Sequence, residues 1–159
     1  MEPVKFKKIQ LDDVYTSALT ARLVTNEDGW TRMELVEKKK VETGQPILDA
    51  AIQPLASDCA LLPSVVAQAI GVSVPTLCEI FVLFTGMTTS EFFAAYRFKR
   101  ACEWLACTDL EQEEVAKRSG YASQNAMSQS FLRRIKISPW KYRHQYRPEN
   151  FRDLYRWQA

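Results

Sequence analysis

The chain is 159 residues long and carries 21 Lys and Arg against 19 Asp and Glu, a formal net charge of +2 at pH 7. Hydrophobic residues make up 47% and charged residues 25%, which is ordinary for a globular chain and excludes collagen-like, rod-like and largely disordered classes. This length suits one domain, or two small ones that share a core. No run approaches the roughly 18 apolar residues of a membrane span, and residues 1–14 lack the apolar centre of a signal peptide. We therefore expect a cytoplasmic protein without a membrane partner.

The cysteines and the single histidine show no pattern typical of chemistry. Cys59, Cys78, Cys102 and Cys107 have no CxxC spacing and lie in apolar or helical contexts, so we expect buried thiols rather than disulfides. His144 cannot assemble a metal site with such scattered thiols, and no serine or cysteine near it forms a nucleophile elbow. The sequence predicts no metal, no cofactor and no catalytic residue, and hence not an enzyme.

Residues 1–46 contain one recognisable pattern. Two moderately alternating runs, YTSALTARLVT and WTRMELV, are joined by an Asp-Gly turn signal in NEDG. This pattern favours a β-hairpin within residues 15–36, with a helix over residues 15–25 as the alternative. The segment could also serve as a dimerisation element. The run Lys38, Lys39 and Lys40 is most simply a solvated face or a linker.

An internal repeat governs the rest of the chain. At an offset of 49 to 50 residues, VAQAIGV at 66–72 aligns with VAKRSGY at 115–121. Each copy has apolar residues at helical spacing, then a glycine suited to the left-handed end of a helix, then a serine suited to start the next. This order predicts two helix-turn-helix units, over about 61–86 and 111–136.

The segment between the two units reads as one long helix. Residues 88–108 contain neither Gly nor Pro, and Thr88 and Glu91 have the spacing of a capping box. A helix over about 88–107 would span on the order of 27 Å. It could therefore hold the two units roughly one DNA turn apart, about 34 Å.

The small net charge hides a strong segregation. Residues 55–114 carry three basic and eight acidic side chains, whereas residues 115–147 carry eight basic and no acidic ones. An ordinary solvated surface would mix the two signs, so the basic stretch favours contact with a polyanion. Its members are Lys117, Arg118, Arg133, Arg134, Lys136, Lys141, Arg143 and Arg147.

Several short motifs follow one another at 113–143, in the segment EEVAKRSGYASQNAMSQSFLRRIKISPWKYR. They are an aliphatic-Ala pair, a Gly-aromatic pair, Ser-Gln, a Phe followed by basic residues, Ser-Pro and Tyr-Arg. Here the chain resembles the DNA-binding domain of the AraC family of bacterial transcription regulators, over roughly residues 47–147. Residues 85–105 look like the family's linker region. The resemblance implies a mainly α fold of seven helices, two helix-turn-helix units in successive major grooves of double-stranded DNA, and transcription regulation. The family's common sugar-sensing barrel needs more chain than residues 1–46, so we expect no small-molecule sensor of that type.

Within the second unit, residues 124–134 form the expected recognition helix. Met127, Phe131 and Ile135 would point inward at helical spacing. The outward side chains include amides and a guanidinium that can bond base edges in the major groove. Candidate base contacts are Gln124, Asn125, Ser128, Gln129 and Arg133, and candidate phosphate contacts are Ser123, Lys136 and Arg118. An amide-rich solvated helix is the alternative.

The first unit departs from the family pattern. Its segment VPTLCEIFVLF at 74–84 has no basic residue, and Val82, Leu83 and Phe84 are apolar where family members are polar. Such residues indicate a covered surface. They could pack against residues 1–46, form a homodimer contact or dock another transcription protein, so major-groove recognition through this unit is not expected.

The tail, residues 148–159, alternates Phe151, Tyr155 and Trp157 with Arg152 and Arg156. We favour a tail that folds back onto the domain over one that stacks on nucleic acid. The sequence as a whole predicts a sequence-specific regulator that reads the major groove mainly through its second unit. The alternative is a protein-interaction regulator that keeps this fold without sequence-specific DNA binding.

Overall fold

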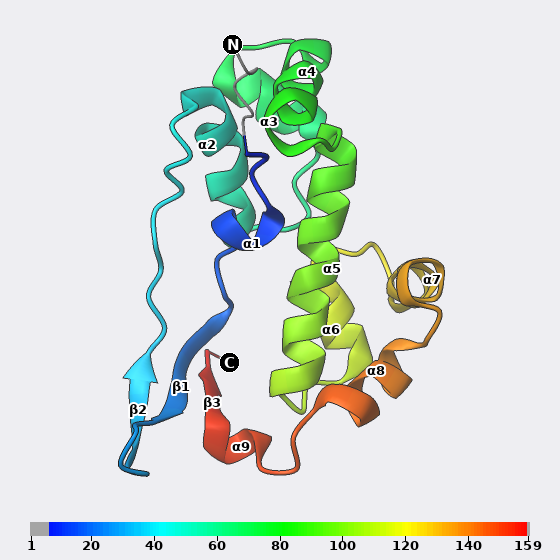
Figure 1. Cartoon of the computed structure of the whole chain (residues 1–159). Helices are drawn as coiled ribbons and strands as arrows, with labels where there is room; N and C mark the ends of the chain where they lie inside the picture. Colours follow the sequence, from blue (N-terminus) through cyan, green and yellow to red (C-terminus); the bar gives the residue numbers. More distant parts are fainter. Residues whose placement is uncertain (1–6, 159) are drawn as a thin grey trace, which may run out of the picture.

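The long helix α5 (Thr89–Cys107) forms the axis of the molecule in the computed structural model, which describes residues 7–158 (Figure 1). The predicted capping box is present: Thr88 Oγ1 accepts the Glu91 N–H at 3.1 Å, and the Glu91 carboxylate accepts the Thr88 N–H at 3.3 Å. At the other end, the Thr108 hydroxyl donates to the Trp104 carbonyl at 2.5 Å. With 19 residues, α5 spans about 29 Å.

The first helix-turn-helix unit packs at one end of α5. It comprises α2 (Pro46–Ile52), the 3-10 helix η1 (Gln53–Ala56), α3 (Pro63–Ile70) and α4 (Val74–Thr85). Gly71 ends α3 with a φ of +91°, and the Ser73 hydroxyl caps α4 by accepting the Thr76 N–H. Leu77 and Phe81 of α4 are fully buried against Phe92 of α5.

The second unit repeats this arrangement at the other end of α5. It comprises α6 (Gln112–Arg118), α7 (Gln124–Ile135) and α8 (Pro139–Tyr146). Its core contains Leu105, Val115, Met127 and Phe131, all fully buried. Residues 46–146 thus contain seven α-helices, α2 to α8, as the family resemblance implies. The prediction of two units joined by one long helix is confirmed.

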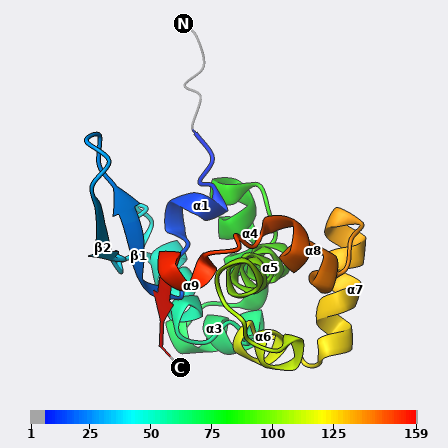
Figure 2. The ribbon, with the colours of Figure 1, turned by 90° about the horizontal axis from the view of Figure 1, so that it is seen from below.

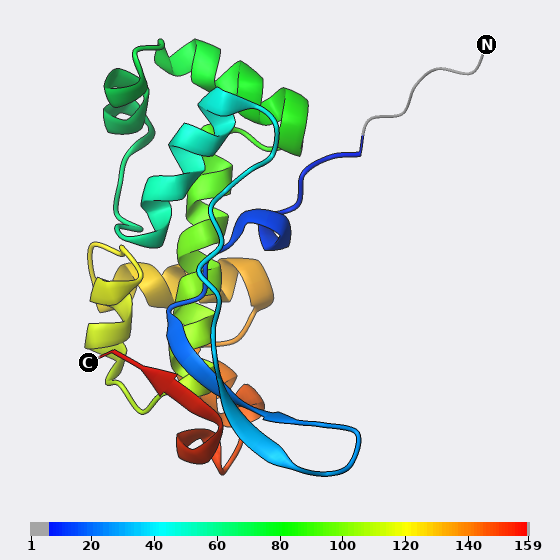
Figure 3. The ribbon, with the colours of Figure 1, turned by 90° about the vertical axis from the view of Figure 1, so that its left-hand side faces the viewer.

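A small antiparallel sheet joins the two ends of the chain. Strands β1 (Leu19–Thr25) and β2 (Thr31–Leu35) form the predicted hairpin, so the alternative of a helix over residues 15–25 is wrong. The third strand, β3 (Tyr155–Trp157), follows the short helix α9 (Phe151–Leu154) and pairs with β1. The strand order is β2-β1-β3 (Figure 3). The tail therefore folds back onto the domain, as predicted.

A buried polar cluster fixes the N-terminal segment to α5. The short helix α1 (Leu11–Val14) leads to Tyr15, whose hydroxyl donates to Glu103 at 3.0 Å and accepts from Arg100 Nε at 2.9 Å. Lys38 is exposed, as predicted for a solvated face, and its Nζ also donates to the Leu19 carbonyl at 2.6 Å and to that of Ser17. The segment that returns from the hairpin is thereby tied to the strand that starts it.

The views agree that the sheet and α7 lie on opposite sides of α5 (Figures 1 and 2). In residues 7–158, no single helix is long and apolar enough to cross a membrane. Only α3 and α4 taken as a pair, bent by 100°, meet that requirement by length and composition. All four cysteines are free thiols; Cys59 is buried, and Cys78, Cys102 and Cys107 are half-buried rather than buried as predicted.

Candidate nucleic-acid interface

The sequence of α7 determines where this helix begins and which of its faces is buried. The Ser123 side chain accepts the Ala126 N–H at 3.0 Å and so caps the first turn. Met127 and Phe131 are fully buried one turn apart, and Ser130 beside them is also buried. These three positions fix which face of α7 packs on the domain and leave the opposite face in solvent.

The exposed face of α7 carries most of the predicted contact residues. Asn125, Gln129 and Arg133 are exposed at spacings of four, so they form one stripe along the helix. Gln124 is also exposed, and its amide donates to the Gln112 carbonyl oxygen of α6 at 3.4 Å. Ser128 is half-buried beside them. This stripe presents amide donors and acceptors and a guanidinium to solvent, which is the set that base edges require.

Two residues next to this stripe are not among the individual contact residues that the sequence predicts. Leu132 is exposed on α7, where an apolar group can contact a thymine methyl. Lys117 of α6 is exposed and shares a hollow of about 480 Å³ with Ser123, Gln124 and Asn125. The repeat itself could have indicated Leu132, because the aligned residue at an offset of 50 is Val82, which was singled out as a surface residue.

The end of α7 is basic and has an unusual backbone conformation. Arg133, Arg134 and Lys136 are exposed there, where the helix dipole favours positive charge. Lys136 has a φ of +66°, and it is the only non-glycine residue with a positive φ in residues 7–158. The aligned position in the first unit is Gly86, with a φ of +78°. A lysine thus occupies a position that suits glycine.

Arg118 lies apart from the other predicted contacts. Its Nε donates to Glu114 at 3.0 Å and its Nη1 to the Gln158 carbonyl at 3.1 Å. Its guanidinium also lies 5.3 Å from the ring centre of Trp104 and 5.4 Å from that of Trp157. These contacts hold the C-terminal tail on the side of α5 away from α7, so we leave Arg118 out of the DNA interface proposed below.

The first unit presents a different surface at the aligned positions. The offset of 50 pairs Glu79 with Gln129 and Leu83 with Arg133. Glu79 and Leu83 are both exposed on α4, and Leu83 is 68% exposed. An acidic and an apolar side chain therefore stand where α7 has an amide and a guanidinium, and neither suits a phosphate backbone.

The N-terminal segment covers only part of the apolar surface predicted on α4. Ile9 N–H donates to the Phe84 carbonyl at 2.8 Å, and the half-buried Phe84 ring packs on the core of the first unit. Val82 and Leu83 stay exposed, although the Lys8 Nζ lies 3.4 Å from each of their carbonyl oxygens. Leu83 and Phe84 line a mostly apolar cavity of about 650 Å³ next to residues 7–9. The N-terminal segment therefore covers Phe84 but leaves Val82 and Leu83 exposed.

Cys59, Cys102 and Cys107 lie in surroundings that disfavour thiolate chemistry. Burial raises the pKa of Cys59, that of Cys102 to about 11 and that of Cys107 to about 12. A nucleophilic cysteine needs the opposite shift. In residues 7–158, no group of three or more His, Cys, Asp or Glu side chains could hold a metal ion.

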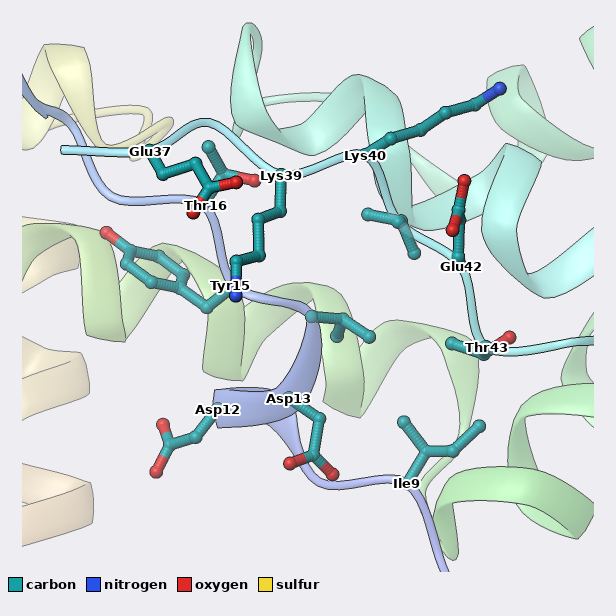
Figure 4. Close-up of a pocket in the computed structure, with 12 residues that line it drawn as sticks. Ile9, Asp12, Asp13, Tyr15, Thr16, Glu37, Lys39, Lys40, Glu42 and Thr43 are labelled. Atoms are coloured by element: carbon teal, nitrogen blue, oxygen red, sulfur yellow. The ribbon is translucent and has the colours of Figure 1, made fainter.

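A groove of about 450 Å³ lies between residues 9–16 and the return segment 37–43, away from α7 (Figure 4). Its lining mixes acidic residues, such as Asp13 and Glu42, with Lys39 and Lys40. Lys39 extends across the groove toward the stretch that contains Tyr15, whereas Lys40 points away (Figure 4). Its four carboxylates outnumber its two lysines, so the groove does not favour an anionic ligand.

A family model described as a helix-turn-helix domain matches residues 66–145, which run from within α3 through α4, α5, α6 and α7 into α8. The chain belongs to the AraC-type helix-turn-helix family. The family and the fold are those of DNA-binding transcription regulators, which are not enzymes.

Two proteins similar to this chain match it over part of its length. The uncharacterized helix-turn-helix transcriptional regulator YtdP of Bacillus subtilis is 34% identical over 71 residues, which are 45% of this chain and 9% of that much longer protein. The C-terminal domain of AraT, a response regulator from Geobacillus stearothermophilus, superposes with a TM-score of 0.62 at 27% identity. That alignment covers 68% of this chain and 92% of the AraT domain.

One solved neighbour was determined with DNA. The DNA-binding domain of AdpA, a global transcriptional factor in complex with a target DNA, has a TM-score of 0.60 and 25% identity to this chain. The superposition covers 65% of this chain and 94% of the AdpA domain. The AraC-type domain described here therefore shares its fold with a domain that binds DNA.

Proposed function

We propose that this protein is a sequence-specific regulator of bacterial transcription that reads the major groove of double-stranded DNA mainly through α7. The observation that carries the proposal is the exposed stripe of Asn125, Gln129 and Arg133 on a helix whose opposite face is fully buried. Glutamine and asparagine can bond adenine bidentately, and arginine can bond guanine. Because bacterial chromosomal DNA lies in the cytoplasm, the proposal also places the protein there.

Each predicted contact residue except Arg118 has a role in this proposal. Gln124, Asn125, Gln129 and Arg133 contact base edges, with Ser128 at the margin of the stripe. Ser123 at the N-terminus of α7 and Lys136 at its C-terminus contact phosphates, which sets the register of the helix without reading sequence. Lys117 joins the phosphate contacts because it shares the hollow that borders the first turn of α7.

Titration of labelled duplex DNA with the full chain at a series of salt concentrations tests the proposal. Contact with about four phosphates predicts a log-log slope of about −3.6 for the binding constant against salt. Selection from random duplexes should then return one preferred motif. A flat salt response, or no binding at low salt, would sink the DNA interpretation.

A second candidate function is regulation by protein contact, with the fold kept and no sequence-specific DNA binding. The exposed apolar side chains of Val82, at 44%, and Leu83, at 68%, favour it, because isolated regulators gain nothing from such a surface. A homodimer or another transcription protein would be the partner. Binding to DNA with a steep salt slope but without a preferred motif would support this second function over the first.

A further inference from the structure

A cleft of about 410 Å³ is lined by residues of α5, of the segments that flank the sheet, and of both helix-turn-helix units. The N-terminal segment, the return segment from the hairpin, η1, α5, α6 and the C-terminal tail all contribute to it. The residues that line it include four cations, Lys38, Lys39, Arg100 and Arg118, and no acidic side chain. The cleft is therefore positive, unlike the mixed groove of Figure 4.

Arg100 is a buried cation with no carboxylate in direct contact, although the Tyr15 hydroxyl links it to Glu103. It is only 6% exposed, and its guanidinium donates to neutral acceptors, namely the Tyr15 hydroxyl and the Thr16 and Ala56 carbonyls. Among the described residues, no carboxylate lies within ion-pairing distance of it. Glu103, three residues along α5, accepts instead from Tyr15, from Ser17 and from the Ala18 N–H. Buried charges in proteins are normally paired.

Trp104 supplies a second unsatisfied group in the same lining. The residue is 5% exposed, and its indole Nε1–H is buried with no acceptor among residues 7–158. Arg118 lies over its ring at 5.3 Å. A buried donor without a partner costs free energy unless some acceptor reaches it. An anion in this cleft would offer such an acceptor and would also pair with Lys38, Lys39 and Arg100, whereas Arg118 already pairs with Glu114.

DNA held by α7 does not account for this charge. The sheet side of α5, where the cleft opens, is opposite to the side that carries α7 (Figures 1 and 2). The cleft is also of the size that small-molecule sites commonly have, about 300 to 1,000 Å³. Serine, threonine and glutamine side chains complete its wall, and these suit oxygen-rich ligands.

We propose that this cleft binds a small organic anion that carries a phosphate or a carboxylate group. The anionic group pairs with Arg100 and the cleft lysines and accepts a hydrogen bond from Trp104. Because the wall contains residues of both helix-turn-helix units and of both chain ends, the bound anion fixes their mutual placement. The site is independent of the DNA surface and extends the function proposed above.

The test uses the full chain, without DNA, in a buffer free of phosphate and carboxylates. Inorganic phosphate or succinate is titrated in, with sodium chloride adjusted to keep the ionic strength constant, and the Tm is followed. At about one hundred times the Kd of the probe we expect a saturating rise in Tm of roughly 5–10 °C. A response to phosphate alone identifies a phosphate group as the ligand feature, and a response to succinate alone identifies a carboxylate.

A charge-matched pair of variants separates the cleft from general effects of salts on stability. Gln53 lines the cleft, and its Oε1 accepts the Val41 N–H at 2.7 Å. Gln53→Glu keeps that acceptor but adds a negative charge, so it should raise the Tm without ligand and abolish the response to the probe. Gln68→Glu adds the same charge on the exposed face of α3 and should respond like the unmodified protein.

Circular dichroism shows whether Gln53→Glu still folds. If it does not, a second pair of variants tests the same cleft. Lys39→Gln removes a cation that lines the cleft, whereas Lys40→Gln removes its neighbour that does not. We expect the first to weaken probe binding about five- to tenfold and the second to leave it unchanged. Failure of both probes to give a saturable response, persistence of that response in Gln53→Glu, or equal effects of Lys39→Gln and Lys40→Gln would each overturn the proposal.

Discussion

Gly120 shows at the scale of one residue how closely the second unit fits the first. It ends the turn after α6 with a φ of +86°, and a Cβ added there would lie 2.4 Å from the Cys59 carbonyl carbon. Cys59 belongs to the loop before α3, so the turn of one unit packs on the backbone of the other. Gly71, the aligned glycine of the first unit, has a φ of +91° but nothing within 4 Å of an added Cβ.

This difference predicts unequal costs for the same substitution. Gly71→Ala should lower the free energy of unfolding by about 1 kcal/mol, because only the left-handed backbone is strained. Gly120→Ala adds overpacking against rigid backbone and should cost about 2–4 kcal/mol in total. Urea denaturation of both variants measures these values. Equal losses would show that the two units do not pack together through this turn.

Glycine and alanine substitutions of Lys136 should differ in stability but have the same effect on DNA binding. Its φ of +66° suits glycine, and its charge lies at the C-terminus of α7. Lys136→Gly should be about 1 kcal/mol more stable than Lys136→Ala, because only alanine keeps the backbone strain. If Lys136 contacts a phosphate, both variants should reduce the salt slope of DNA binding by about 0.9. Denaturation and salt titration of the two variants check both parts, and an unchanged slope would remove Lys136 from the interface.

At the scale of elements, α4 and α7 are two copies of one helix with different surfaces. Both start at a serine cap, and both bury two large apolar residues one turn apart. Their inward faces are therefore nearly interchangeable, whereas the outward positions differ in charge and polarity. The fold requires only the inward pattern, so the outward faces are free to serve different functions.

The aligned pair Gln129 and Glu79 tests that division of function. On the preferred duplex, Gln129→Ala should lose roughly 1–3 kcal/mol of binding free energy and relax the preference at one or two base positions. Glu79→Ala removes an exposed side chain from the matching place on α4, and we expect the selected motif to stay the same. Selection from random duplexes with each variant provides the measurement. If Glu79→Ala alters the selected motif and Gln129→Ala does not, the first unit reads the bases and the proposal for α7 fails.

At the scale of the whole molecule, the sequence predicted the parts that depend on local signals. Thr88 and Glu91 predicted the start of α5, the repeat predicted both helix-turn-helix units, and the Asp-Gly turn predicted the hairpin. Each of these signals lies within a few residues of the structure that it specifies. The spacing of Met127 and Phe131 likewise predicted which face of α7 is buried.

The parts that could not be predicted depend on contacts between distant residues. A three-residue strand such as β3 has no recognisable pattern, and its partner β1 lies more than 130 residues away. The sequence predicts a phosphate contact for Arg118 from its charge, and its i,i+4 partner Glu114 is also visible there, but its contacts with the tail and with two tryptophans depend on the fold. Arg100 was not singled out, since its burial depends on the N-terminal segment crossing α5.

The pairing of β3 with β1 predicts that the two ends of the chain are stabilised together. The Trp157 ring packs edge-on against Trp104 at 5.7 Å, and its strand pairs with residues 19–22. Trp157→Ala should cost roughly 2 kcal/mol of unfolding free energy, about half the value for a fully buried tryptophan, and should speed amide hydrogen exchange across residues 19–22. Trp30→Ala, at a hairpin residue that is 75% exposed, should change stability by less than about 0.5 kcal/mol. If exchange across residues 19–22 stays slow in Trp157→Ala, other contacts hold the hairpin, and the Trp157 side chain does not contribute to its stability.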